Sequence, residues 1–142
     1  MFVSEKIFID LVLDVLKEND GNLPSLFDGV ISKNTFYKYR QRWPNLQTVL
    51  KIANHLKVSL DYLFKFSNEN RFSVYSYSAN VFCKNLLQYL ENKNMSGRQF
   101  CEELHFSRDN ILRWKKGILP TIPTLLQITE FFDCTLDDLI KK

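Results

Sequence analysis

The chain contains an internal repeat, and this repeat limits the folds open to it more than any other feature. Residues 44–64 align with residues 120–140 without a gap, at an offset of 76. The two segments carry identical residues at seven spaced positions. These pairs are Pro44 and Pro120, Thr48 and Thr124, Leu50 and Leu126, Ile52 and Ile128, Leu60 and Leu136, Asp61 and Asp137, and Leu63 and Leu139. Such a match indicates two copies of one folding unit.

Composition and apolar spacing favour helices over strands. The 142 residues include only four Gly and four Pro, fewer turn residues than an all-β fold of many short strands would need. Strand-like content is confined to residues 72–78, and it does not alternate cleanly. We therefore predict an all-α chain, with an N-terminal domain over residues 1–65, a linker over 66–79 and a C-terminal domain over 80–142. Domains of about 65 residues bury a modest core, but helical ones fold alone.

Several classes of protein lack support in the sequence. Cys83, Cys101 and Cys134 are widely spaced, form no CxxC and sit in apolar helical surroundings, so we interpret them as core residues in a reducing cytosol. His55 and His105 have no HExxH context and no obvious nucleophile beside them. We expect no enzyme, no metal site and no cofactor. The first residues do not resemble a secretory leader and no apolar run approaches the ~20 residues of a membrane span, so we expect a cytoplasmic protein.

The second copy predicts five helices, at about 80–92, 97–104, 108–116, 122–132 and 136–140. Ser96 and Gln99 are spaced for a capping box, and Ser107, Thr121 and Thr135 are expected to begin the following helices. Gly117 is placed to stop the third helix in a left-handed conformation. On that helix Ile111 and Trp114 are expected to face the core, with Leu112 partly covered.

This pattern resembles the lambda repressor/Cro-like (XRE-type) helix-turn-helix family. The resemblance is carried by Met95–Gly117, Pro120, Thr124–Ile128 and Thr135–Leu139, and it covers residues 80–140. It implies two tandem five-helix domains, the first one divergent.

The first copy predicts helices at 5–17, within 23–28, at 33–41, at 46–56 and at 60–64. Ser32, Asn45 and Ser59 are the expected caps, and Asp20-Gly21-Asn22 is the expected break after the first helix. The match to the family is strong from Ser32 onward and weak before it. Val30 would be costly at a positive φ, so we favour a modified turn that uses Gly29.

Basic residues concentrate on the third helix of each copy. Residues 107–117 carry four basic side chains and one acid, residues 33–42 carry four and none, and the whole chain nets only +3. Such clustering is expected of a DNA-binding protein, although a solvated charged face is the alternative for both helices. By resemblance, the DNA-binding residues of the second copy are Ser107, Arg108, Asp109, Asn110, Arg113, Lys116 and Arg98. Those of the first copy are Lys33, Asn34, Thr35, Tyr37, Lys38, Arg40 and Arg42.

The resemblance implies a sequence-specific regulator of transcription that binds double-stranded DNA and acts as a repressor. The abundance of Phe, Ile, Asn, Lys and Tyr, whose codons are A/T-rich, favours a bacterial or phage origin. We expect either a homodimer or an intramolecular pseudo-dimer, with no membrane partner and no small-molecule effector. The alternative is a protein-binding module, antitoxin-like or inhibitory, that uses the same fold against a protein partner.

Overall fold

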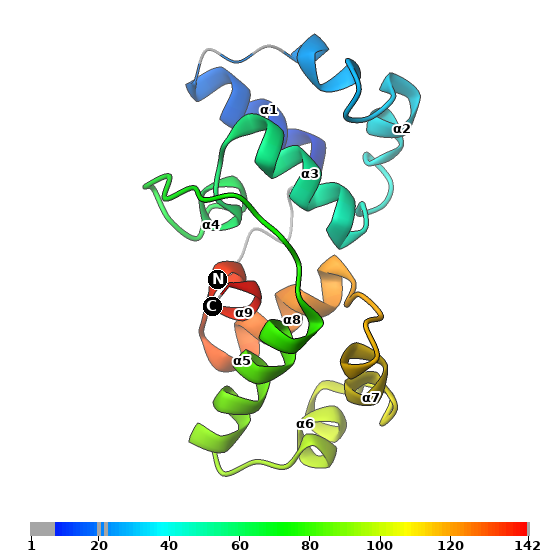
Figure 1. Ribbon diagram of the computed structural model, residues 1–142, viewed down its shortest axis with the longest axis vertical. Coiled ribbons are helices and arrows are strands. Elements are labelled where there is room, and N and C mark those ends of the chain that lie inside the picture. Colours follow the sequence, from blue (N-terminus) through cyan, green and yellow to red (C-terminus); the bar gives the residue numbers. More distant parts are fainter. Residues whose placement is uncertain (1–7, 20, 22, 142) are drawn as a thin grey trace. The chain divides into compact units, whose positions relative to one another are not determined.

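The computed structural model describes residues 8–19, 21 and 23–141, which form nine α-helices and one 3-10 helix without any strand (Figure 1). The all-α prediction is thereby confirmed for the described residues. The chain is divided into two compact units, of which the first ends at Tyr75 and the second begins at Ser76. The first unit contains α1 (Phe8–Glu18), η1 (Leu23–Phe27), α2 (Lys33–Lys38), α3 (Leu46–Leu56) and α4 (Leu60–Leu63). The second contains α5 (Ala79–Asn92), α6 (Gly97–Leu104), α7 (Asn110–Lys115), α8 (Ile122–Phe132) and α9 (Leu136–Ile140).

An apolar stripe at helical spacing produces α1. Its six buried residues are Phe8, Ile9, Leu11, Val12, Val15 and Leu16. Residues 5–7 of the expected helix lie outside the described residues, as do Asp20 and Asn22 of the expected break. After the helix, the backbone N–H of Gly21 donates to the Leu16 carbonyl at 2.7 Å.

The segment between α1 and α3 departs most from a regular helix-turn-helix. The short helix expected within 23–28 is the 3-10 helix η1, and Leu26 is its fully buried anchor. Gly29 then adopts φ 92°, as the modified turn requires, and Val30 does not. Ser32 caps α2 by accepting from the Thr35 amide, but α2 ends at Lys38, three residues before the predicted end.

The next two helices begin at their predicted caps. Asn45 accepts from the Thr48 amide at the start of α3, and Ser59 accepts from the Tyr62 amide at the start of α4. The end of α3 is a left-handed residue, Lys57, at φ 56°. α4 packs against α1 and α3 (Figure 1). Trp43 is half-buried and stacks on the buried Phe64 with ring centroids 5.9 Å apart, so it covers the edge of the core of the first unit.

Residues 66–75, which we call the arm, lie on the first unit although they form no helix or strand. Asn70 accepts from the Ser59 amide at 2.9 Å and donates to the Lys57 carbonyl at 2.9 Å. Asn54 holds the other end by pairing with both the N–H and the C=O of Tyr75, at 2.8 and 3.1 Å. The Tyr75 hydroxyl accepts from the Leu60 amide at 2.6 Å, so the buried ring also caps α4.

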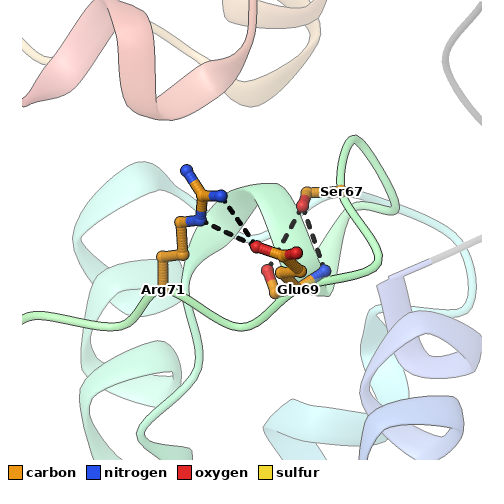
Figure 2. A network of polar contacts seen from close by, with 3 residues as sticks. All are labelled: Ser67, Glu69 and Arg71. Atoms are coloured by element: carbon orange, nitrogen blue, oxygen red, sulfur yellow. Dashed lines mark hydrogen bonds and ion pairs between the residues drawn. The ribbon is translucent and has the colours of Figure 1, made fainter.

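A small polar network shapes the first half of the arm (Figure 2). The Ser67 hydroxyl accepts from the Glu69 amide at 3.1 Å, which closes a tight turn. The Glu69 carboxylate accepts from Arg71 through Nε and Nη2, at 3.0 and 2.7 Å. Both charged side chains are well exposed, so the pair organises the turn more than it stabilises the fold. Of the segment predicted as a linker, residues 66–75 thus belong to the first unit and residues 76–78 precede α5.

The second unit follows the expected order of helices closely. α5 begins after the Ser78 cap, one residue earlier than predicted, and packs against α6, α7 and α9. Asn85 on α5 donates to the carbonyls of Leu139 and Lys141, at 2.9 and 2.6 Å, which holds the end of α9. Thr121 and Thr135 cap α8 and α9 as predicted.

Candidate nucleic-acid interface

The α6–turn–α7 segment of the second unit is built from two helix ends that the sequence specifies. Ser96 and Gln99 form the predicted capping box, so α6 starts at Gly97. At the other end His105 adopts φ 59°, and its N–H donates to the carbonyls of Cys101 and Glu102. This left-handed residue stops α6 and turns the chain toward α7.

Aromatic packing holds α7 in place. Trp114 is 4% exposed, as the core prediction required. Its ring meets Phe82 of α5 at 5.5 Å and Phe106 of the turn at 6.3 Å, both edge-to-face. Phe106 in turn packs on Phe100 of α6 at 5.8 Å. Because these contacts come from α5, α6 and the turn, the inner face of α7 is anchored and its outer face is left to solvent.

α7 begins two residues later than predicted. The helix starts at Asn110 and its N-cap is Asp109, which makes no side-chain cap hydrogen bond. Ser107 does not cap the helix; its hydroxyl accepts weakly from the Asp109 amide at 3.4 Å within the turn. Ser107, Arg108 and Asp109 therefore lie on the turn that leads into α7. The physical reason lies in the backbone: the Asn110 amide donates to the Ser107 carbonyl at 3.1 Å, three residues back, which closes a turn, and the i→i−4 bonds of a helix begin only with the Arg113 amide, which donates to the Asp109 carbonyl at 2.9 Å.

The outer side of this segment is basic. Arg108, Arg113, Lys115 and Lys116 are all exposed, and Asn110 is half-buried at the start of α7. Of the eight acidic residues of the second unit, four lie in α8, in α9 or between them, whereas Glu102, Glu103 and Asp109 lie on α6 and the turn. Gly117 follows at φ 98° and ends the segment as predicted.

Leu112 is the residue of this face that the sequence reasoning missed. It was expected to be partly covered, but its side chain is 54% exposed. The available signal was its spacing, since a residue two positions from a buried Trp on a helix points to the opposite side.

Gly97 allows α6 and α7 to approach closely. A Cβ at this position would lie 2.9 Å from Cδ1 of Ile111, closer than real contacts allow. Arg98, the next residue, is the first side chain of α6 that projects a charge.

One carboxylate contacts two of the candidate arginines. Glu102 lies 3.2 Å from Nε of Arg98 and 3.9 Å from Nη2 of Arg108. All three side chains are more than half exposed, so these ion pairs are weak individually. They nevertheless bring α6 and the turn into one charged cluster beside α7.

In the first unit the candidate residues divide between α2 and the turn after it. Lys33, Asn34 and Lys38 are exposed on α2, whereas the Thr35 hydroxyl is engaged by Ser32 at 2.7 Å. The remaining candidates are Tyr37, on α2, and Arg40 and Arg42, which follow the helix. The Arg40 guanidinium lies 5.5 Å from the centre of the Tyr37 ring, a cation–π contact on the surface.

The described part of the chain gives little support for a reactive cysteine, a metal site or a membrane-spanning helix. Cys83 and Cys101 are buried, burial raises the pKa of both thiols, and none of the three cysteines forms a disulfide. No three His, Cys, Asp or Glu side chains among residues 8–19, 21 and 23–141 gather as metal ligands. Within the same residues, every helix is too short or too polar to cross a membrane.

Comparison with known proteins gives one match. Residues 85–141 match the family described as the Cro/C1-type HTH DNA-binding domain. The match spans α6, α7, α8, α9 and most of α5, so the basic face lies within it. No curated protein and no solved structure matches the chain. The second unit thus contains a Cro/C1-type helix-turn-helix domain, and the resemblance seen in its sequence is confirmed there.

Proposed function

We propose that the chain is a sequence-specific regulator of transcription, of bacterial or phage origin, that represses by occupying double-stranded DNA. The observation that carries the proposal is the basic outer face of α7, which the buried Trp114 holds in place within a Cro/C1-type domain. In this docking mode α7 enters the major groove. The protein bound to its DNA site would then exclude polymerase from that site without any catalytic step.

The residues of the second unit have distinct proposed roles. Arg113 suits a bidentate contact to guanine O6 and N7, and Asn110 suits adenine N6 and N7. Arg108 and Asp109 approach the groove from the turn, which leaves them freer to adjust than helical residues. Backbone phosphates are assigned to Arg98, Lys116 and the Ser107 hydroxyl.

We further propose that the first unit is a divergent copy of the same domain. α3 and α8 are both eleven residues long, both end in a left-handed residue, and both precede a short Ser- or Thr-capped helix. α2 occupies the place of α7 in the order of elements. Lys33, Asn34 and Lys38 would then face bases, and Tyr37, Arg40 and Arg42 would face phosphates. Among these residues, Thr35 is the least suited to contact DNA, because its hydroxyl already accepts a hydrogen bond from the Ser32 hydroxyl.

The alternative, a protein-binding module, is motivated by the aromatic residues of the predicted linker and by the irregular first copy. Tyr75 is buried and Phe72 is half-buried against it, with ring centroids 6.4 Å apart. These rings are therefore used within the first unit. The DNA-binding proposal is better supported, and the alternative becomes an outcome of the test.

Selection of bound duplexes from a random DNA library, at about 0.15 M ionic strength, tests the proposal. We expect two related half-sites about 10 base pairs apart, one helical turn. A homodimer or an intramolecular pseudo-dimer would each give this spacing, and the mass of the complex distinguishes them. No enriched motif, together with capture of one stoichiometric protein, would favour the protein-binding alternative.

Variants then assign the contacts. Arg113→Ala should weaken operator binding roughly 5- to 150-fold and relax specificity at one base pair, the range for loss of a bidentate base contact. Lys84→Ala, which removes an exposed charge from α5, is the matched control and should change affinity little. Unchanged specificity in Arg113→Ala would refute the role of that residue. Lys38→Ala and Arg40→Ala report in the same way on the first unit.

A further inference from the structure

Leu112 is a large apolar side chain in the middle of a cationic helix surface. It is 54% exposed, although α7 holds only six residues and Trp114 on the same helix is 4% exposed. Leu112 is not needed for the core, because the aromatic contacts of Trp114 already anchor the helix. Its exposure leaves it available for a contact at the surface.

The helix places Leu112 among charges. It lies two residues before Trp114, which puts it on the opposite side of α7. Lys116 is one turn further along the same side, and Arg113 and Lys115 flank it. All three basic side chains are exposed.

A surface of this composition suits DNA better than an apolar protein partner. Protein docking patches are contiguous apolar areas, with charged residues depleted at their centre. Here Leu112 is flanked by the exposed cations of α7, which matches a ligand that is polyanionic overall and offers small isolated apolar groups. The major groove of DNA is such a ligand, because phosphates line it and the C5-methyl groups of thymines project into it.

We propose that Leu112 recognises a thymine by packing on its C5-methyl group in the major groove. This inference rests on the proposed function and adds a specificity-determining residue to it. Hydrogen-bonding neighbours such as Arg113 would read adjacent bases, and Leu112 would add discrimination without a hydrogen bond.

The experiment replaces each thymine of the selected operator by deoxyuridine, which removes only the methyl group. Wild-type protein should bind one substituted operator about four-fold more weakly, the factor that corresponds to burial of one methyl group. Leu112→Ala should bind the thymine operator more weakly by a similar or larger factor and lose the preference for thymine over uracil at that position. Leu112→Met, which keeps a flexible apolar side chain, should retain the preference. Leu87→Ala, which truncates a 43% exposed leucine on α5, is the matched control.

The outcomes separate this inference from the proposed function. An enriched operator with equal thymine-to-uracil preferences in wild type and Leu112→Ala would overturn the inference while the DNA-binding proposal stands. Failure to obtain any operator would overturn the proposed function itself. Loss of self-association or of a protein complex in Leu112→Ala, with DNA recognition intact, would also overturn the inference. Equal thermal unfolding of the variants and wild type excludes misfolding as the cause.

Discussion

The left-handed His105 between α6 and α7 makes a quantitative prediction, that His105→Gly stabilises the second unit. A non-glycine residue in this region costs roughly 1–2 kcal/mol, and His lies toward the tolerant end of that range. Glycine removes this cost but gives the unfolded chain more freedom, which costs about 0.4–1 kcal/mol. The His105 side chain is exposed, so little packing is lost. The net gain is about 0.5 kcal/mol, and strain relief outweighs the entropy term.

The assay follows unfolding of the full chain in urea and by heating. Trp43 and Trp114 are the two tryptophans, one in each unit, so fluorescence of Trp114 in a Trp43→Phe background reports on the second unit. For a domain of this size the gain corresponds to a rise in Tm of roughly 2–4 °C. His105→Ala is the matched control, because it removes the imidazole but keeps the Cβ that causes the strain. We expect His105→Gly to unfold with a higher free energy than the wild type, and His105→Ala to be no more stable than the wild type.

Two results would refute this reasoning. A loss of stability in His105→Gly would mean that the imidazole contributes more than the exposed geometry indicates. An equal gain from His105→Ala would mean that the strain does not come from the Cβ. Operator affinity should be unchanged in the glycine variant, because the turn already has the conformation that glycine prefers.

Two further predictions concern charge and titration. Glu102→Gln should raise operator affinity about two- to five-fold at low salt, because it releases the two arginines that the carboxylate contacts, and the effect should shrink as the salt concentration rises. Glu103→Gln makes the same charge change on α6 and should have a smaller effect on affinity. Equal effects of the two variants would argue that the contacts of Glu102 do not matter. Burial, with lesser contributions from Cys134 and Asp138, raises the pKa of Tyr89 to about 12. The neutral phenol therefore contributes stability that is complete below pH 10 and is lost as the pH rises from 10 to 12. Tyr89→Phe should reduce the fall of the urea midpoint over this range, and an identical fall in the variant and wild type would contradict the shifted pKa.

Much of the second unit could be predicted because local signals agree with its packing. Ser96, Thr121 and Thr135 cap helices whose apolar faces point to one core, so capping and periodicity lead to the same boundaries. The third helix was predicted two residues too early, because a serine before a charged run fits both an N-cap and a turn. Only the three-dimensional course of the chain decides between these two hydrogen-bonding options.

The arm depends on contacts that sequence spacing does not contain, whereas the exposure of Leu112 follows from its position two residues before the buried Trp114. Asn54 and Tyr75 are 21 residues apart, and no periodic pattern links an asparagine side chain to a distant backbone. The turn at Gly29 was predicted because it involves one steric rule at one residue. Short-range geometry was therefore accessible from the sequence, whereas long-range polar pairing was not.

The arm also determines how the two units are tethered. Tyr75 is held by Asn54 and α5 starts at Ala79, so the stretch left to extend covers four Cα–Cα steps, at most about 14 Å. Successive major-groove faces are about 34 Å apart, so if both units bind DNA, most of that spacing must come from the units themselves. A short tether gives the second unit a high effective concentration at its site and penalises other spacings. The hydrogen bonds of Asn54 and Asn70 would thus limit the length of the flexible connection between the units. Breaking these bonds would lengthen the connection and let one chain bind operators with more than one half-site spacing.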